Sequence, residues 1–90
     1  MKHANFKNSQ IILNALSEVL KEERETKQKS IRILAYEYDI PKSLISRLEN
    51  SKNEPKILSL WAISEALELK LSDLIKKLEN KLPENYSLLD

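Results

Sequence analysis

The sequence predicts a compact all-α fold of five helices in one domain. Apolar residues recur every three or four positions along most of the chain, as they do on the buried face of a helix. No segment shows the strict alternation of apolar and polar residues that is typical of a half-buried strand. Ninety residues with a hydrophobic content of 41 % can form one small core and leave little room for a second domain.

The first helix is expected from Ser9 to about Glu25. Asn8 or Ser9 caps it, because either side chain can accept a hydrogen bond from a free backbone N–H group. Its apolar face consists of Ile12, Leu13, Leu16 and Leu20. The second helix is expected over Ile31–Tyr38, with Ser30 as its cap. Its inner face consists of Leu34, Ala35 and Tyr38.

Prolines mark several ends of the remaining helices. Pro41 disfavours helical geometry at the residue before it and suits the first turn of a third helix, which is expected over Pro41–Asn50. A fourth helix follows over about residues 56–68. Ser72 caps the fifth helix, and Pro83 stops it. The inward positions of these three helices are Ile45, Leu48, Ile57, Leu60, Ile63, Ser64, Leu67, Leu71, Leu74, Ile75 and Leu78.

The chain is expected to divide into an N-terminal arm (residues 1–8), a helical domain (9–82) and a C-terminal tail (83–90). Two features leave alternatives open. Trp61 lies at the edge of the inward face of the fourth helix, so it either closes the core or belongs to a subunit interface, where aromatic residues are enriched. Three residues of the tail either fold back onto the domain or meet a second copy: Tyr86, Leu88 and Leu89.

The composition excludes several classes of function. The sequence has no cysteine, which excludes disulfide bonds, thiol chemistry and thiolate metal sites. It has no apolar run near the ~20 residues that span a bilayer and no apolar signal-peptide core, so we expect a cytoplasmic protein without a membrane partner. The one histidine is His3, and there is no glycine for a phosphate-binding loop. We therefore expect no enzyme, no metal and no cofactor.

The charges nearly cancel over the whole chain but not along it. Lys and Arg number 15 and Asp and Glu number 14, which excludes a strongly basic coat for nucleic acid. Residues 1–56 carry 11 basic and 8 acidic side chains, whereas residues 57–90 carry 4 and 6. The first part is the better candidate for contact with a polyanion, although a solvated surface of mixed charge explains the same numbers.

The segment between Ser30 and Asn50 has the layout of a helix-turn-helix. Its two short helices are joined by the turn "DIP", and in such a unit the second helix can enter the major groove of DNA. The stretch "SIRILAYEYDIPKSLISRLENSKNEP" resembles the lambda-repressor/Cro-like (XRE-type) helix-turn-helix family. The resemblance covers about Leu13 to Ile75. It rests on Leu34-Ala35, Ile45–Asn50, Lys52, Pro55, Leu60, Ala66-Leu67 and Leu71–Ile75.

The resemblance implies a base-reading surface on the third helix. Lys42, Ser43 and Arg47 hold the positions that face base edges in this family. Arg and Lys can donate to guanine O6 and N7, and Ser can donate or accept. Ser46 is grouped with them, with sugar or phosphate as its alternative contact. The alternative for Lys42 and Ser43 is an exposed helix start, and for Arg47 a surface cation or a phosphate contact.

Phosphate contacts position a protein on DNA without specifying sequence. The candidates are Ser30, where the helix start favours an anion, and Asn50, Lys52 and Asn53 in the turn after the third helix. Arg32 and Lys56 are weaker candidates, for which a solvated surface position is an equal alternative. The resemblance also implies a salt bridge between Arg24 and Glu49. Glu49 would then brace the reading helix, because a carboxylate facing phosphates would repel them.

The chain departs from the family at four positions. Ile31 replaces a glutamine that anchors a phosphate, so that contact is lost or is made by the backbone alone. Asp39, Ser51 and Glu68 replace glycines, and each replacement costs roughly 1 kcal/mol where positive φ is kept. We predict positive φ at Asp39, because aspartate tolerates left-handed geometry better than most residues.

These observations predict a sequence-specific DNA-binding transcriptional regulator, acting as a repressor or autoregulator. Its partner would be double-stranded DNA, bound by a homodimer whose contact surface is the fifth helix with the tail. The alternative is an antitoxin or controller-type protein. Its main partner would be another protein, held by the C-terminal tail, and DNA binding would be secondary.

Overall fold

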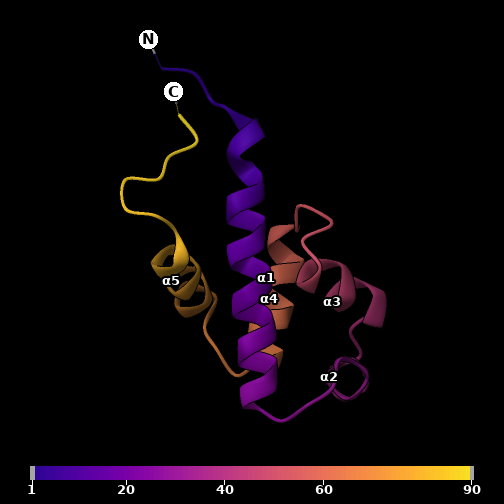
Figure 1. Cartoon of the computed structure of the whole chain (residues 1–90). Coiled ribbons are helices and arrows are strands. Elements are labelled where there is room, and N and C mark those ends of the chain that lie inside the picture. The colour runs from indigo at the N-terminus through magenta and orange to yellow at the C-terminus, as the bar shows by residue number, and fades with distance from the viewer. Residues whose placement is uncertain (1, 90) are drawn as a thin grey trace.

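The computed structural model describes residues 2–89 as an all-helical fold (Figure 1). A single turn of 3-10 helix, η1, precedes five α-helices. Their bounds are η1 Phe6–Asn8, α1 Ser9–Thr26, α2 Ile31–Tyr38, α3 Lys42–Glu49, α4 Ile57–Ala66 and α5 Leu71–Lys81. Within residues 2–89 no strand forms, apart from an isolated bridge between Ala4 and Leu89. The predicted five-helix all-α class is confirmed.

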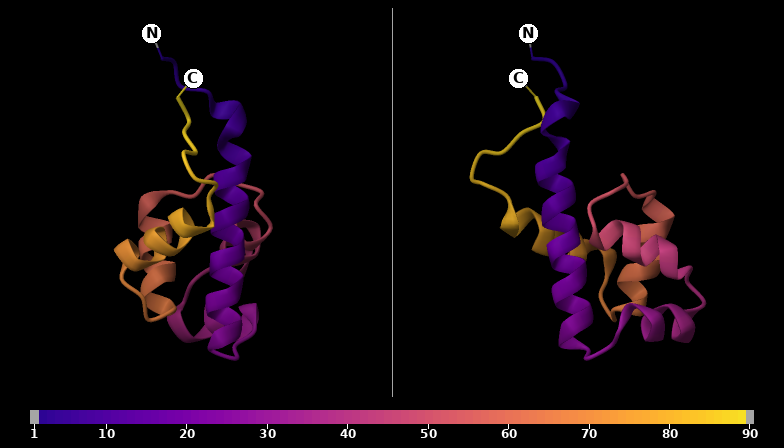
Figure 2. Two further views of the ribbon diagram at one scale, coloured as in Figure 1. Left: turned by 60° about the vertical axis from the view of Figure 1, so that its left-hand side comes forward. Right: turned by 45° about the vertical axis from the view of Figure 1, so that its right-hand side comes forward.

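The long helix α1 organises the molecule. Helix α3 packs against one side of α1 and α5 against the other, while α2 packs on α3 and α4 on α5 (Figures 1 and 2). The molecule measures 47 × 21 × 18 Å along its principal axes. Its length arises because the amino-terminal end of α1 projects beyond the other four helices (Figure 2).

The core lies where the apolar faces of all five helices meet. Leu74 is 0 % exposed, and Leu34, Ile63 and Leu67 are each 1 % exposed. Full burial of such a side chain contributes about 1.5–3 kcal/mol, so this cluster supplies most of the stability. The other apolar members are Ala15, Leu16, Val19, Leu20, Ala35, Ile45, Leu48, Leu60, Ala66 and Leu78.

Three residues considered for the core are exposed instead. Tyr38 ends α2, just before the chain turns away, and the Lys29 ammonium lies 5.6 Å from the centre of its ring. Ile57 is the first residue of α4 and is 59 % exposed. Trp61 is 51 % exposed, so of its two alternatives the closing of the core is excluded. The prediction for Ile57 was wrong because α4 has apolar residues on more than one face, and periodicity did not identify the face that packs.

The caps follow the sequence only in part. Ser30 caps α2 as predicted, accepting a hydrogen bond from the Ile33 N–H at 3.1 Å. Asn8 makes no side-chain cap for α1, because the chain enters that helix through η1. Ser72 is not the cap of α5: the helix already begins at Leu71, so Ser72 lies inside its first turn.

Four helices end in a left-handed residue, and none of these residues is a glycine. Positive φ at Asp39, 53°, confirms the prediction made for that position. The other three are Gln28 (56°), Ser51 (57°) and Glu68 (61°). At each end, the N–H of the next residue donates back across the last turn, which closes the helix in the way that usually requires glycine. Helices α1 to α4 therefore each end in the left-handed backbone conformation that glycine usually supplies, although another residue type stands at each of these positions.

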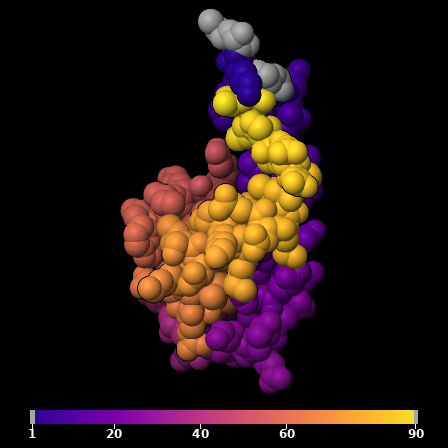
Figure 3. Space-filling model, turned by 90° about the vertical axis from the view of Figure 1, so that its left-hand side faces the viewer, coloured from indigo at the N-terminus to yellow at the C-terminus, as the bar shows by residue number. Residues whose placement is uncertain are grey.

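The arm and the tail lie side by side along the projecting end of α1 (Figure 3). The Asn5 N–H donates to the Leu88 carbonyl, and the Tyr86 hydroxyl donates to the Asn8 carbonyl. Tyr86 and Leu88 are partly buried, whereas Leu89 is 54 % exposed. The tail thus folds back within the chain. Residues 1 and 90, the ends of the predicted arm and tail, lie outside the described residues, and the division into arm, domain and tail stays a prediction.

Candidate nucleic-acid interface

Helix α3 has one buried face and one free face. Ile45 and Leu48 point into the core and are each 2 % exposed. Lys42, Ser43 and Arg47 are all exposed on the other side. Ser43 and Arg47 lie one turn apart and therefore share a face. The Arg47 Nε donates to the Ser43 carbonyl at 3.3 Å, which leaves the two terminal nitrogens of the guanidinium for other partners.

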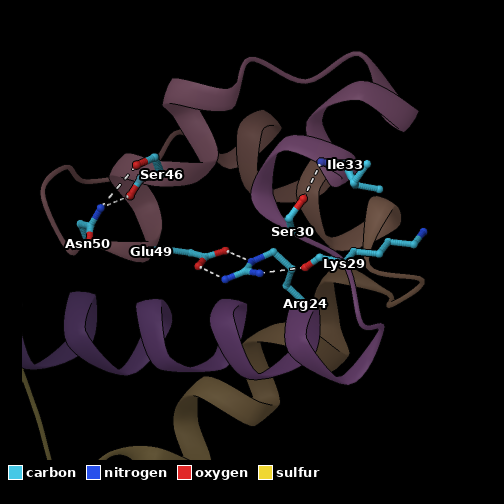
Figure 4. A network of polar contacts seen from close by, with 7 residues as sticks. All are labelled: Arg24, Lys29, Ser30, Ile33, Ser46, Glu49 and Asn50. Carbon is cyan, nitrogen blue, oxygen red and sulfur yellow. Dashed lines mark hydrogen bonds and ion pairs between the residues drawn. The ribbon is translucent and has the colours of Figure 1, made fainter.

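Ser46 and Asn50 form a local pair at the end of α3 (Figure 4). The Asn50 amide Nδ2 donates to the Ser46 carbonyl at 2.8 Å and lies 3.4 Å from its hydroxyl oxygen. Ser46 is half-buried, whereas Asn50 is exposed. The amide nitrogen of Asn50 is therefore engaged by Ser46 within the chain.

The turn after α3 is tied to α1 by hydroxyl groups. The Ser51 Oγ donates to the Ser17 Oγ at 2.8 Å, and the Ser17 hydroxyl donates to the Asn14 carbonyl at the same distance. The Gln10 amide also approaches the Ser51 carbonyl, at 3.4 Å. These hydrogen bonds fasten the turn to α1 at Ser51. Lys52 and Asn53, which follow Ser51, are exposed.

A bidentate ion pair joins α1 to the end of α3 (Figure 4). The Arg24 Nε lies 2.7 Å from one Glu49 carboxylate oxygen, and the Arg24 Nη2 lies 2.9 Å from the other. The third nitrogen, Nη1, donates to the Lys29 carbonyl at 2.8 Å. The two side chains are only 12 % and 6 % exposed. The hydrogen bond to Glu49 raises the pKa of Arg24 above its usual value.

The ion pair implied by the resemblance is thus present, and its effect on the orientation of α3 remains a prediction. Glu49 points toward α1 and away from the exposed face of α3 (Figure 4). A carboxylate in this position adds no negative charge to the surface that carries Lys42 and Arg47. This orientation is consistent with the predicted role as a brace.

The start of α2 and the start of α3 share a shallow basic cavity. The cavity measures about 420 Å³ and is lined by Arg24, Ser30, Ile31, Arg32 and Lys42. The structure therefore brings Lys42, predicted to read bases, next to Ser30, predicted to hold a phosphate. It also gives Arg32 a defined place beside both residues. Ile31 lines the same cavity and offers no polar side-chain atom there.

A match to known sequences decides the family. The sequence model of the helix-turn-helix family HTH_3 matches residues 20–74, more than half of the chain and the whole of α2 and α3. The chain belongs to this helix-turn-helix family. It is an XRE-type, DNA-binding regulator, as the resemblance implied. No curated protein matches the sequence.

Solved structures of helix-turn-helix regulators share the fold. A point mutant of the restriction-modification controller protein C.Esp1396I has a TM-score of 0.72 and 25 % identity, covering 83 % of this chain and 95 % of that one. The wild-type controller protein has a TM-score of 0.69 and 27 % identity, covering 78 % and 92 %. The clp gene regulator ClgR from Corynebacterium glutamicum has a TM-score of 0.71 at 22 % identity, covering 80 % and 92 %, and supports the fold alone.

Some contacts of this helix-turn-helix protein were not predicted from its sequence. Ser17 is 9 % exposed and was not singled out, although a serine inside the apolar face of α1 was a usable signal. Its partner Ser51 lies 34 positions away, so the pairing itself had no sequence signature. Gln10 was missed for the same reason. Within residues 2–89, no group of His, Cys, Asp or Glu side chains is arranged to hold a metal ion, and no helix has the length and apolar character needed to cross a membrane.

Proposed function

We propose that this helix-turn-helix regulator reads specific DNA sequences by placing α3 in the major groove. The observation that carries the proposal is the free face of α3. Lys42, Ser43 and Arg47 are exposed there, while the opposite face is fixed by buried Ile45 and Leu48. A short helix attached rigidly on one side and polar on the other matches the groove, which is about 12 Å wide.

The side chains divide by chemistry into readers and positioners. Arg47 has two free terminal nitrogens, the number needed to pair with O6 and N7 of one guanine. Ser43 adds a small donor or acceptor one turn earlier, and Ser46 is half-buried behind them. Lys52 and Asn53 extend past the end of the helix, where a phosphate strand would run, and Asn50 precedes them in the chain.

The basic cavity at the start of α2 supports a second phosphate contact. Ser30 still has a hydroxyl hydrogen to donate after accepting the bond from Ile33. Arg32 and Lys42 line the same cavity and would supply the positive charge. In this arrangement Lys42 serves the backbone as well as the bases, and the family's missing glutamine at Ile31 is compensated by its neighbours.

We further propose that the regulator acts as a homodimer and as a repressor or autoregulator. One α3 reaches only a few base pairs. Two copies related by a two-fold axis would reach half-sites about 34 Å apart, one helical turn of DNA. Blocking transcription requires no further domain, since occupancy of a promoter is sufficient.

Selection of bound sites from a random pool of DNA tests the proposal directly. The expected result is a recovered sequence with two related half-sites. Arg47→Ala should then cost about 1–3 kcal/mol of discrimination at one base position. Lys52→Ala should weaken all sequences alike and reduce the dependence of affinity on salt by about one phosphate contact.

Lys76→Ala is the matched control for both variants, because Lys76 is an exposed lysine on α5, far along the chain from the helix-turn-helix. It should leave affinity and specificity unchanged. The proposed role of Arg47 would be wrong if Arg47→Ala and Lys52→Ala weakened every selected site by the same factor.

A second candidate function is that of a controller-type or antitoxin protein with a protein partner. The likeness to the controller protein C.Esp1396I favours it, and the exposed Leu89 of the tail is the candidate contact. In this case DNA binding would be secondary. The two functions differ in one measurement: a regulator retains selected DNA alone, with affinity falling steeply as salt rises, whereas a pure protein-binding module retains none.

A further inference from the structure

One face of α1 carries polar residues that contact the end of α3 and the turn after it. Gln10, Ser17 and Arg24 are spaced seven residues apart. Seven residues are almost two turns of an α-helix, so the three side chains share one face, about 10 Å apart along the axis. Arg24 binds Glu49 at the end of α3 (Figure 4), and the other two residues contact Ser51. These three residues form the polar stripe of α1.

The polar stripe holds Ser51 by its side chain and by its backbone. The Ser51 hydroxyl donates to the Ser17 hydroxyl oxygen at 2.8 Å, and the Gln10 amide donates to the Ser51 carbonyl at 3.4 Å. The Ser17 hydroxyl donates onward to the Asn14 carbonyl at 2.8 Å. The Asn14 side-chain oxygen accepts a further bond from the Gln10 amide at 2.9 Å. These hydrogen bonds join Ser51 to α1 in one connected network.

Ser51 is unusual in combining this network with a left-handed backbone. Its φ is 57°, a value that glycine adopts without steric cost. A glycine at this position would have no hydroxyl and could not reach Ser17, which is only 9 % exposed. A hydroxyl group buried to this degree loses free energy when it has no partner. The serine thus gives up an unstrained backbone and gains an attachment to α1.

The attachment lies immediately before the two residues proposed to face phosphate. Lys52 and Asn53 follow Ser51 and are both exposed. The Lys52 N–H donates back to the Arg47 carbonyl at 3.1 Å, so the backbone at Ser51 sets the direction in which the chain leaves α3. A segment that is ordered before it meets its partner loses less conformational entropy on binding.

We propose that Gln10, Ser17 and Ser51 are positioning residues for the phosphate contacts of Lys52 and Asn53. This inference rests on the proposed reading of DNA and adds to it residues of α1 that act through the turn. Phosphate contacts carry no sequence information. Loss of the positioning residues should therefore weaken binding to every DNA sequence alike, in the same way as loss of Lys52 itself.

The affinity of the full chain for DNA, measured at several salt concentrations, tests the inference. Ser51→Gly keeps the left-handed backbone and removes the hydroxyl from Ser17 and from the Leu13 carbonyl, which lies 3.4 Å away. The expected affinity is about 3–10-fold lower for the selected duplex and for an unrelated one. Its dependence on salt should become shallower. The melting temperature should stay near the wild-type value, because relief of positive φ offsets the lost bond.

Two further variants change the α1 side of the network and keep the turn sequence. Ser17→Ala removes the partner of the Ser51 hydroxyl, which can still reach the Leu13 carbonyl. Gln10→Ala removes the donor to the Ser51 carbonyl. Both should lower the affinity for all duplexes by a smaller factor than Ser51→Gly does. They also test the inference if Ser51→Gly does not fold.

A double-mutant cycle separates positioning from a general loosening of the domain. If Ser51 acts through the phosphate-facing side chains, Ser51→Gly should weaken binding by a smaller factor in a Lys52→Ala chain than in the wild type. In a chain that carries both Lys52→Ala and Asn53→Ala, the remaining factor should be below about twofold.

Ser64→Ala is the matched control for Ser17→Ala. Ser64 is a buried serine inside α4, and its hydroxyl donates to the carbonyl three residues earlier, that of Trp61, at 2.7 Å. Ser17 has the same kind of bond within α1. Among the hydrogen bonds of residues 2–89, Ser64 accepts none from the turn after α3. Ser64→Ala should leave the DNA affinity of the folded chain and its salt dependence unchanged.

Three outcomes would overturn the positioning role. These are an unchanged affinity of folded Ser51→Gly, a loss confined to one base position, and full additivity of Ser51→Gly with Lys52→Ala and Asn53→Ala. The failure of the proposed function looks different, because the wild type itself would then retain no selected DNA. Wild-type binding together with unchanged variants would contradict the positioning alone.

Discussion

The two ends of α1 are held by different kinds of contact. The carboxyl-terminal half buries Val19 and Leu20 and carries the ion pair from Arg24 to α3. It also pairs with α5, through Glu23 with Lys77 at 3.2 Å and Glu22 with Lys81 at 2.7 Å. At the other end Ile11 is 45 % exposed. The neighbours there are the arm, in which Phe6 is 71 % exposed, the tail, and the Ser51 carbonyl that Gln10 contacts.

The difference shows how the proposed DNA-reading unit, α2 and α3, is attached to the rest of the molecule. Helices α2 and α3 are attached to the well-packed half of α1, by the core and by Arg24. The projecting end is held by the backbone hydrogen bond from Asn5 to Leu88 and by hydrogen bonds from the Tyr86 hydroxyl and the Gln10 amide. We therefore expect substitutions in the first region to unfold the whole domain and those in the second to loosen only one end.

The largest effect is expected from Arg24→Ala. The change leaves the Glu49 carboxylate almost fully buried without a partner, which should lower the free energy of unfolding by about 3–5 kcal/mol. Unfolding in urea measures it. Lys77→Ala is the control, because it removes the ion pair between Lys77 of α5 and Glu23 of α1. That pair lies nearer the surface and should contribute about 0–1 kcal/mol. Equal effects of the two variants would contradict the distinction between buried and surface pairs.

A matched pair of leucines compares the two ends directly. Leu20→Ala removes a side chain that is 2 % exposed and should cost about 2–5 kcal/mol. Leu88→Ala, in the partly buried tail, should cost about 1 kcal/mol or less and should accelerate hydrogen exchange only near the arm. The comparison fails if Leu88→Ala lowers the global stability as much as Leu20→Ala does.

Glycine substitutions at the left-handed positions should produce smaller effects of the opposite sign. Gln28→Gly relieves positive φ at an exposed residue and should stabilise the domain by up to about 1 kcal/mol. Ser51→Gly relieves the same geometry but loses the bond to Ser17, so its net effect should be near zero. Thermal unfolding of both variants measures the difference, and a larger gain at Ser51 would contradict the role of that hydroxyl.

The smallest expected effect is on the loss of stability at acid pH, to which Glu68 contributes. The hydrogen bond from Lys27 lowers the pKa of Glu68 below its usual value of 4.5. A lowered folded-state pKa contributes stability above the unfolded value, and that contribution is lost as the pH falls through the folded value. Between about pH 5 and pH 3, Glu68→Gln should therefore lose slightly less stability than the wild type. An identical pH dependence of the two proteins would show that this exposed pair contributes nothing.

The sequence predicted the positions of the helices better than the faces they bury and the contacts between them. Spacing located α1 to α4 to within about two residues, and Asp39 was correctly assigned positive φ because aspartate tolerates that geometry. Ile57 was misplaced and Trp61 was left open because α4 offers two apolar faces and one sequence does not say which is inside. The Ser17–Ser51 bond joins positions that only the folded chain brings together.

The hydrogen bond from Arg47 to the Ser43 carbonyl would affect how slowly the proposed DNA site is released. Its Nε is already held on the Ser43 carbonyl, so the guanidinium has fewer orientations in the free protein. Immobilising an arginine costs up to about 2 kcal/mol of side-chain entropy, and part of that loss precedes the encounter here. Such preorganisation strengthens a contact without adding one, and differences among related complexes fall mainly on the dissociation rate. Residence time on the operator would then depend on a hydrogen bond that never touches DNA.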